Sequence, residues 1–146
     1  MALIENKKAR FNYEILETLP AGIELFGFEV KALRNRLGSL EGSHVTVRGT
    51  ETYLIGAHIP PYQAKNAPDS YNPERHRKLL LTKKEIEKLA EIESQKGLTI
   101  VPISMYNLGK KIKVEVGIVR GKKKYDKRET IKKRDVERDL GRTLKN

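Results

Sequence analysis

Regular alternation of apolar and polar residues constrains the fold of this chain most. In residues 111–119, Ile112 and Val114 alternate with Lys and Glu side chains. A period of two places every second side chain on the same face, which is typical of a half-buried β-strand. Residues 98–106 show the same alternation, and a short link containing Gly109 joins the two segments. The two segments are therefore predicted to form an antiparallel hairpin.

Two earlier pairs of segments alternate in the same way and are also predicted to form hairpins: residues 13–18 with 22–27, and residues 45–47 with 52–55. The first pair is separated by a turn-like stretch that begins at Pro20, and the second by a link containing Gly49. Pro102 cannot donate a hydrogen bond to a neighbouring strand. We therefore expect it at a sheet edge or a bulge.

Two segments depart from the β period. Thr82 and Glu85 have the spacing of a capping box, and the apolar residues that follow predict an amphipathic helix over residues 82–93. A shorter helix is predicted over residues 29–36, before Gly38. Both helices would interrupt a chain that is otherwise made of strands.

Residues 60–77 contain four prolines, which exclude a helix or a central strand and predict a long loop. Six short strands in hairpins with an inserted helix predict a fold that is mainly β with short helices. We expect a closed antiparallel barrel of the oligonucleotide-binding (OB-like) kind, followed by a basic C-terminal tail.

Length and composition favour one globular domain. The chain has 146 residues and no cysteine, so its stability must come from packing, and a reducing cytoplasm is the expected location. The N-terminal apolar run is too short for a signal peptide, and no segment has the roughly 20 apolar residues of a membrane span. We expect a barrel domain over residues 1–119 and a tail over residues 120–146.

The tail carries most of the excess charge. Residues 120–146 contain 12 Lys and Arg against 5 Asp and Glu, which gives +7 of the formal net charge of +11. Such a segment can neutralise phosphates, so it predicts a nucleic-acid partner, although an anionic membrane surface would also attract it. Its few large apolar residues predict a tail that is disordered when free and helical when bound. The alternative is a permanent helix docked on the barrel.

The patterns of catalytic and metal-binding sites are missing from the sequence. His44, His58 and His76 are far apart in the chain and no cysteine accompanies them, which disfavours a metal site. No serine lies in a nucleophile-elbow pattern, and no glycine-rich phosphate loop is present. The sequence predicts a binding protein without catalytic residues, cofactor, metal or small-molecule substrate.

Basic residues next to aromatic ones indicate where RNA could bind. Residues 6–11 and residues 75–78 form two basic clusters, for each of which a solvated surface is the alternative. Tyr125 lies among five Lys and Arg residues, so a stacking plane and phosphate-binding groups occur together. Of these three sites, the one around Tyr125 is the sharpest candidate.

Six motifs in this order and spacing resemble the SsrA-binding protein family, also called small protein B, the bacterial partners of transfer-messenger RNA (tmRNA, or SsrA RNA). They are Asn-Lys-Lys-Ala-Arg at residues 6–10, Tyr-Glu-Ile at 13–15, Ala-Gly-Ile at 21–23, Gly-Phe-Glu-Val-Lys-Ala-Leu-Arg at 27–34, Arg-Lys-Leu-Leu-Leu at 77–81 and Gly-Lys-Lys-Lys-Tyr-Asp-Lys-Arg at 121–128. The resemblance runs from about Asn6 to the end of the chain.

The resemblance implies a function in trans-translation. The barrel would bind the tRNA-like domain of tmRNA and deliver it to stalled ribosomes. The tail would enter the decoding centre and the empty mRNA path of the small subunit, next to its ribosomal RNA. The stalled chain would then be tagged and the ribosome released, with no chemistry done by the protein and no membrane partner.

The resemblance also implies two sets of site residues. The tmRNA-binding set is Asn6, Lys7, Arg10, Glu29, Lys31, Arg34, Leu80 and Lys113. The ribosome and decoding-centre set is Lys122, Lys123, Lys124, Tyr125, Asp126, Lys127, Arg128, Lys132, Lys133, Arg134, Arg138 and Arg142. Glu29 has the alternative role of an ion pair that orients Lys31 or Arg34, and Leu80 has the alternative of a core position.

Two residues depart from the family pattern. Pro20 stands where many members have an acidic residue, and Tyr125 stands where members often have His. Tyr125 keeps the capacity for stacking but lacks a group that titrates near neutral pH.

The competing interpretations of the whole chain are a generic basic barrel that binds single-stranded or ribosomal RNA, and an RNA-modifying enzyme with an unrecognised catalytic base.

Overall fold

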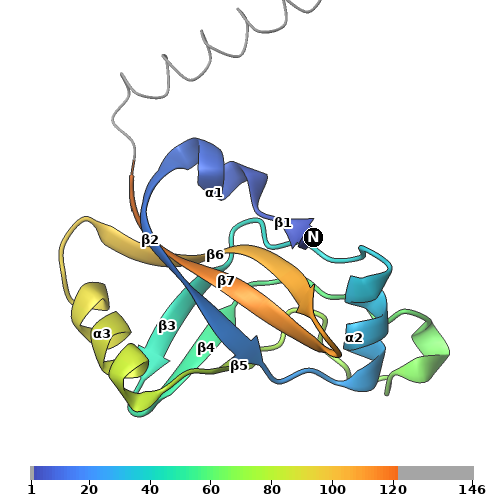
Figure 1. The fold of residues 1–146 in the computed structure, drawn as a ribbon. Coiled ribbons are helices and arrows are strands. Elements are labelled where there is room, and N and C mark those ends of the chain that lie inside the picture. The colour runs from blue at the N-terminus through green and yellow to red at the C-terminus, as the bar shows by residue number, and fades with distance from the viewer. Residues whose placement is uncertain (1, 122–146) are drawn as a thin grey trace, which may run out of the picture.

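The computed structural model describes residues 2–121, which form one antiparallel sheet of seven strands with short helices (Figure 1). The strands are β1 (Ala2–Glu5), β2 (Tyr13–Ile23), β3 (His44–Arg48), β4 (Glu51–Ile55), β5 (Arg77–Leu80), β6 (Leu98–Leu108) and β7 (Lys111–Gly121). The helices are α1 (Lys7–Asn12), α2 (Gly27–Arg34) and α3 (Lys83–Glu93), with a single 3-10 turn, η1 (Ala64–Asn66). The mainly β fold with short helices is therefore confirmed.

The hydrogen-bonded strand order is β1-β6-β7-β2-β5-β4-β3. Among the described residues, the backbone pairing leaves β1 and β3 as the two edges, so these ladders do not close the sheet into a barrel. The sheet is nevertheless strongly curled, and the apolar side chains on its inner face form the core with those of α2 and α3. Leu33, Leu54, Leu89 and Val114 are all completely buried there.

Two of the predicted hairpins are confirmed. In β3–β4, Arg48 pairs with Glu51 around Gly49, which has a φ of +65°. In β6–β7, Leu108 pairs with Lys111 around Gly109, and Pro102 lies at a shift in register, as expected for a residue without an N–H. Local turn chemistry was sufficient to predict both connections.

The first predicted hairpin is wrong, because residues 13–23 form one continuous strand, β2. Pro20, which was assigned to a turn, lies within the strand opposite Glu115 of β7. On its other side, β2 pairs with β5 only at Gly22 and Ile23. Pro20 therefore has a strand neighbour on one side only. The other side of β2 is unpaired at this position, so a residue without an N–H can be tolerated there.

The sequence pattern did not predict β1, α1 or β5. Asn6 shows why the first two form: its Oδ1 accepts a hydrogen bond from the Ala9 N–H at 3.1 Å and so caps α1. The Nδ2 group of Asn6 donates to the carbonyls of Leu40 at 3.2 Å and Pro102 at 2.9 Å. These contacts connect residues that are remote in sequence, so no local pattern reveals them.

Helix α3 is confirmed, together with its capping box of Thr82 and Glu85. At its other end, Glu93 covers the outer edge of β3, where its carboxylate accepts from the Val47 N–H at 2.8 Å and from the Thr46 hydroxyl at 2.7 Å. An exposed strand edge can pair with another chain, and this contact satisfies one of its free N–H groups. Within residues 2–121 no helix is both long enough and apolar enough to span a membrane.

Candidate nucleic-acid interface

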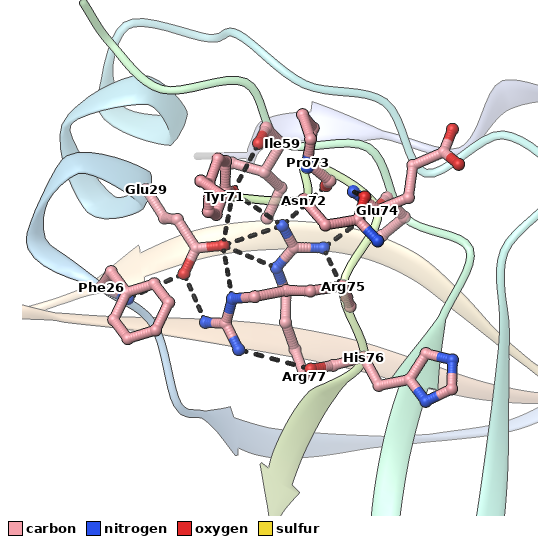
Figure 2. A network of polar contacts seen from close by, with 11 residues as sticks. Phe26, Glu29, Ile59, Tyr71, Asn72, Pro73, Glu74, Arg75, His76 and Arg77 are labelled. Atoms are coloured by element: carbon pink, nitrogen blue, oxygen red, sulfur yellow. Dashed lines mark hydrogen bonds and ion pairs between the residues drawn. The ribbon is translucent and has the colours of Figure 1, made fainter. Parts of the chain in front are cut away.

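A network of polar contacts surrounds Glu29, which lies in the first turn of α2. Phe26 precedes the helix and has no side-chain acceptor for the first N–H groups of the helix, but its own backbone N–H donates to Oε1 of Glu29 at 2.7 Å. The side chain of Glu29 points into the protein and is completely buried (Figure 2). A buried carboxylate is costly unless it is paired and hydrogen-bonded.

Two arginines at or just before the start of β5 pair with this carboxylate and offset the cost of burying its charge. Arg75 contacts both of its oxygens, through Nη2 at 2.5 Å and Nε at 3.2 Å. Arg77 donates to Oε2 through Nε at 2.9 Å and is itself completely buried. The remaining donors of Arg77 reach the carbonyls of Ala57 and Pro73, among others, so its guanidinium is well satisfied.

Tyr71 completes the network. Its hydroxyl lies 2.8 Å from Oε2 of Glu29 and 2.7 Å from the carbonyl of Ile59. Burial and the neighbouring Glu29 carboxylate raise the pKa of Tyr71 to about 12, so the phenol is neutral at physiological pH. Burial alone would raise the pKa of Glu29, but hydrogen bonds from Arg75, Phe26 and Tyr71 outweigh it and hold that pKa below its usual value.

Several members of the predicted tmRNA-binding set lie on one face, around α2 and the β6–β7 turn. Lys31 and Arg34 are exposed on α2, and Arg34 donates to the Lys110 carbonyl in that turn at 2.8 Å. Leu80 and Lys113 flank Gly22 on its two neighbouring strands. They line a shallow groove of about 300 Å³ that also includes Lys110 and Lys111.

Gly22 allows this close approach of strands. A Cβ at this position would lie 3.0 Å from Cβ of Leu80, which is closer than side chains normally pack. Leu80 lies over Gly22 and is 50% exposed, so the alternative that assigned it to the core is wrong. The result is an apolar side chain surrounded by cations on an accessible surface.

Three further members of the set lie on or next to α1, away from that groove. Lys7 and Arg10 are exposed and line a separate depression with Lys8 and Phe11. Asn6 is 4% exposed and holds backbone segments together. The structure thus places the exposed members of the set in two surface groups, with Asn6 supporting the α1 group from within the protein and Glu29 buried beneath α2.

Two sequence-based assignments need correction. The partners of Glu29 are Arg75 and Arg77, not Lys31 or Arg34, and its carboxylate has no exposed surface with which to meet RNA. The basic cluster at residues 75–78 is not a row of surface cations, since Arg77 is buried. Sequence reasoning found this cluster but could not reveal that Glu29, on a distant helix, pairs with two of its arginines.

The predicted tail residues, from Lys122 to Arg142, lie outside the described residues. Among residues 2–121, no group of three His, Asp or Glu side chains is arranged to hold a metal ion. The exposed side chains described above can bind phosphates and apolar surfaces, which are the contacts that RNA backbones and bases require.

The chain is similar to known proteins over almost its whole length. The family model described as SmpB protein matches residues 3–146. An SsrA-binding protein of Gloeothece citriformis (strain PCC 7424) is 48% identical over 143 residues, covering 98% of this chain and 92% of that protein. One of Mesoplasma florum is 50% identical over 140 residues, covering 96% and 94% respectively.

A solved structure described as "tmRNA-SmpB: a journey to the center of the bacterial ribosome" contains a chain with the same fold. The TM-score is 0.70 at 44% sequence identity, and the match covers 83% of this chain and 85% of that chain. The likeness therefore extends over most of both chains. With the family model and the relatives, it shows that this chain belongs to the SmpB protein family.

Proposed function

We propose that this protein binds SsrA RNA (tmRNA) and delivers it to stalled ribosomes for trans-translation. The observation that carries this proposal is the near-complete match to SsrA-binding proteins at 46–50% identity. The described part of the chain is an RNA-binding module that acts without catalysis of its own. A protein that acts on ribosomes in this way would be located in the bacterial cytoplasm.

The folded part recognises the tRNA-like domain of tmRNA. Its two surface groups serve this role: Lys7 and Arg10 at α1, and Lys31, Arg34 and Lys113 around the groove beside Leu80. Lys and Arg side chains neutralise phosphates, and exposed Leu80 offers an apolar contact to a sugar or base. Asn6 and Glu29 support these surfaces from within the protein.

The curled sheet works as a small barrel of the oligonucleotide-binding kind. Supporting this interpretation, β3 lies near β6, and α3 packs against both strands. Residues 1–119 would form this RNA-binding domain, although β7 continues to Gly121. Residues 120–146 would form the tail that is disordered when free and helical on the ribosome.

The tail enters the decoding centre and mRNA path of the small subunit. Its charge of +7 suits a channel lined by ribosomal RNA. Lys122, Lys123, Lys124, Tyr125, Asp126, Lys127 and Arg128 occupy the decoding site, and Lys132, Lys133, Arg134, Arg138 and Arg142 contact phosphates beyond it. Tyr125 stacks on a base of the small-subunit RNA.

Competition binding tests the RNA partner. The full chain is bound to labelled SsrA RNA at about 150 mM salt, where nonspecific phosphate contacts are weakened, and then challenged with excess bulk tRNA. We expect the complex to survive. Ready displacement would instead indicate a generic basic protein that binds single-stranded or ribosomal RNA.

A further inference from the structure

A second groove lies between the start of α2 and the loop that precedes β5. It has a volume of about 390 Å³, and its walls include Phe26, Phe28, Tyr71 and Arg75. Phe26 is 50% exposed, which is unusual for so large an apolar side chain beside a well-formed core. None of these four residues belongs to the predicted tmRNA-binding set, although Arg75 is part of the basic cluster at residues 75–78.

The aromatic rings form a connected row. The centroids of Phe26 and Phe28 lie 5.5 Å apart with a tilt of 32°, and Phe28 meets Tyr71 edge-on at 4.7 Å. The guanidinium carbon of Arg75 lies 4.1 Å from the centre of the Phe26 ring. The row is thus anchored in the protein at Tyr71 and reaches solvent at Phe26.

Contacts to Glu29 hold this arrangement in place. The carboxylate accepts from the Phe26 N–H and from two nitrogens of Arg75, while Tyr71 contacts it from the other side (Figure 2). The side chains would lose little conformational entropy when a ligand binds, because they are already ordered. The groove is therefore pre-organised.

The groove also has a favourable charge. Glu29 contributes one negative charge to the network, whereas Arg75 and Arg77 contribute two positive charges, so one positive charge remains. The Arg75 guanidinium lies over one face of the Phe26 ring, and the exposed part of this stacked pair suits a ligand that has both a π-face and a nearby anion. An unpaired nucleotide has both features, through its base and its phosphate.

We propose that the groove formed by Phe26, Phe28 and Arg75 binds one unpaired base of the bound RNA, which stacks on Phe26. This inference rests on the proposed function and adds a base-stacking site to it. The site gives the protein contact with an unstacked nucleotide, in addition to the phosphate contacts of its exposed cations.

Binding measurements with matched variants test the stacking. We expect Phe26→Ala and Phe26→Leu to weaken binding of full-length SsrA RNA by about 5- to 150-fold, the loss expected for one stacked base. Phe26→Tyr keeps the ring and should bind like the parent chain. Because Phe26 is half exposed, we expect these variants to keep the fold. Unfolding of each variant in urea checks this. Near-parental binding by Phe26→Leu would overturn the proposal.

Fluorescence gives an independent test, since the chain contains no tryptophan. Phe26→Trp introduces a single fluorophore at the groove, and we expect SsrA RNA to quench it on stacking. Leu16→Trp is the control, because Leu16 is 45% exposed near the opposite end of β2 and should be quenched much less. Equal quenching in the two variants would overturn the proposal.

The outcomes separate this inference from the proposed function. If the parent chain loses SsrA RNA to bulk tRNA, the proposed function fails. If the parent chain retains the RNA while Phe26→Ala binds equally well, only the stacking site is wrong. A defect of Phe26→Ala on ribosomes but not with naked RNA would assign the groove to a ribosomal component, which also overturns the proposal.

Discussion

Nη2 of Arg77 lies 2.8 Å from Oε2 of Glu29, and neither side chain exposes any surface to solvent. The pair connects α2 to β5, two elements that are 48 residues apart at this contact. Arg75 approaches the same carboxylate from the solvent side. Glu29 therefore fixes the position of α2, with Lys31 and Arg34 on its surface, relative to the sheet.

Removing the charge of Glu29 should destabilise the fold strongly. Glu29→Gln leaves two arginines facing a neutral amide, one of them fully buried, and we expect a loss of about 3–5 kcal/mol in unfolding free energy. Urea unfolding followed by circular dichroism measures the change. Glu74→Gln, at an exposed position of the same loop, is the control and should change stability by less than about 0.5 kcal/mol. Equal stability of the two variants would contradict this role of Glu29.

The same carboxylate should give the stability a pH dependence. The pKa of Glu29 is lowered in the folded state, so the folded protein binds this proton less readily than the unfolded chain does. The stabilisation is fully present above the ordinary pKa of 4.5 and is lost as the pH falls through the lower, folded-state value. The difference in unfolding free energy between the parent chain and Glu29→Gln should therefore shrink as the pH falls below about 5. A constant difference over this range would disprove the coupling.

These long-range contacts show where prediction from sequence reached its limit. The capping box of Thr82 and the glycine turns at Gly49 and Gly109 are local, and the elements that they define were predicted correctly. The spacing on α2 suggested local partners for Glu29, but its actual partners come from another part of the chain. Pro20 suggested a turn, but it lies within strand β2. The strand can accept a proline there because β5 does not extend far enough to pair with it, and the sequence around Pro20 does not show this.

The edge of β3 offers a test of local stability. Glu93→Ala removes the acceptor of the Val47 N–H, and we expect a cost of about 1 kcal/mol or less, because the contact is exposed. The clearer signal is faster hydrogen exchange at the Val47 amide. Glu91→Ala, on the same helix, is the control and should leave that amide unchanged. Unchanged exchange in Glu93→Ala would show that the Glu93 carboxylate does not protect this amide.

The groove beside Leu80 should contribute to RNA affinity through charge. Lys113→Gln removes one cation from the groove, so binding of SsrA RNA should weaken and the slope of log affinity against log salt should become shallower by up to about one. Lys96→Gln is the control, since Lys96 is exposed just beyond α3 and lines neither the groove beside Leu80 nor the depression at α1. Binding titrations at several salt concentrations measure both effects. Identical slopes for the two variants would remove Lys113 from the interface.

Tagging of stalled chains should depend on the tail even when RNA binding does not. A chain ending at Arg120 keeps both surface groups but lacks most of the excess charge, so we expect near-parental affinity for SsrA RNA and no tagging on stalled ribosomes. Within the tail, Tyr125→Ala should lose about 1–3 kcal/mol of interaction if one base stacks there, whereas Tyr125→Phe keeps the ring and should be tolerated. A reconstituted tagging assay run beside RNA binding measures the two activities separately. Tagging by the truncated chain would refute the role of the tail, and a defect in Tyr125→Phe would show that the hydroxyl contributes as well as the ring.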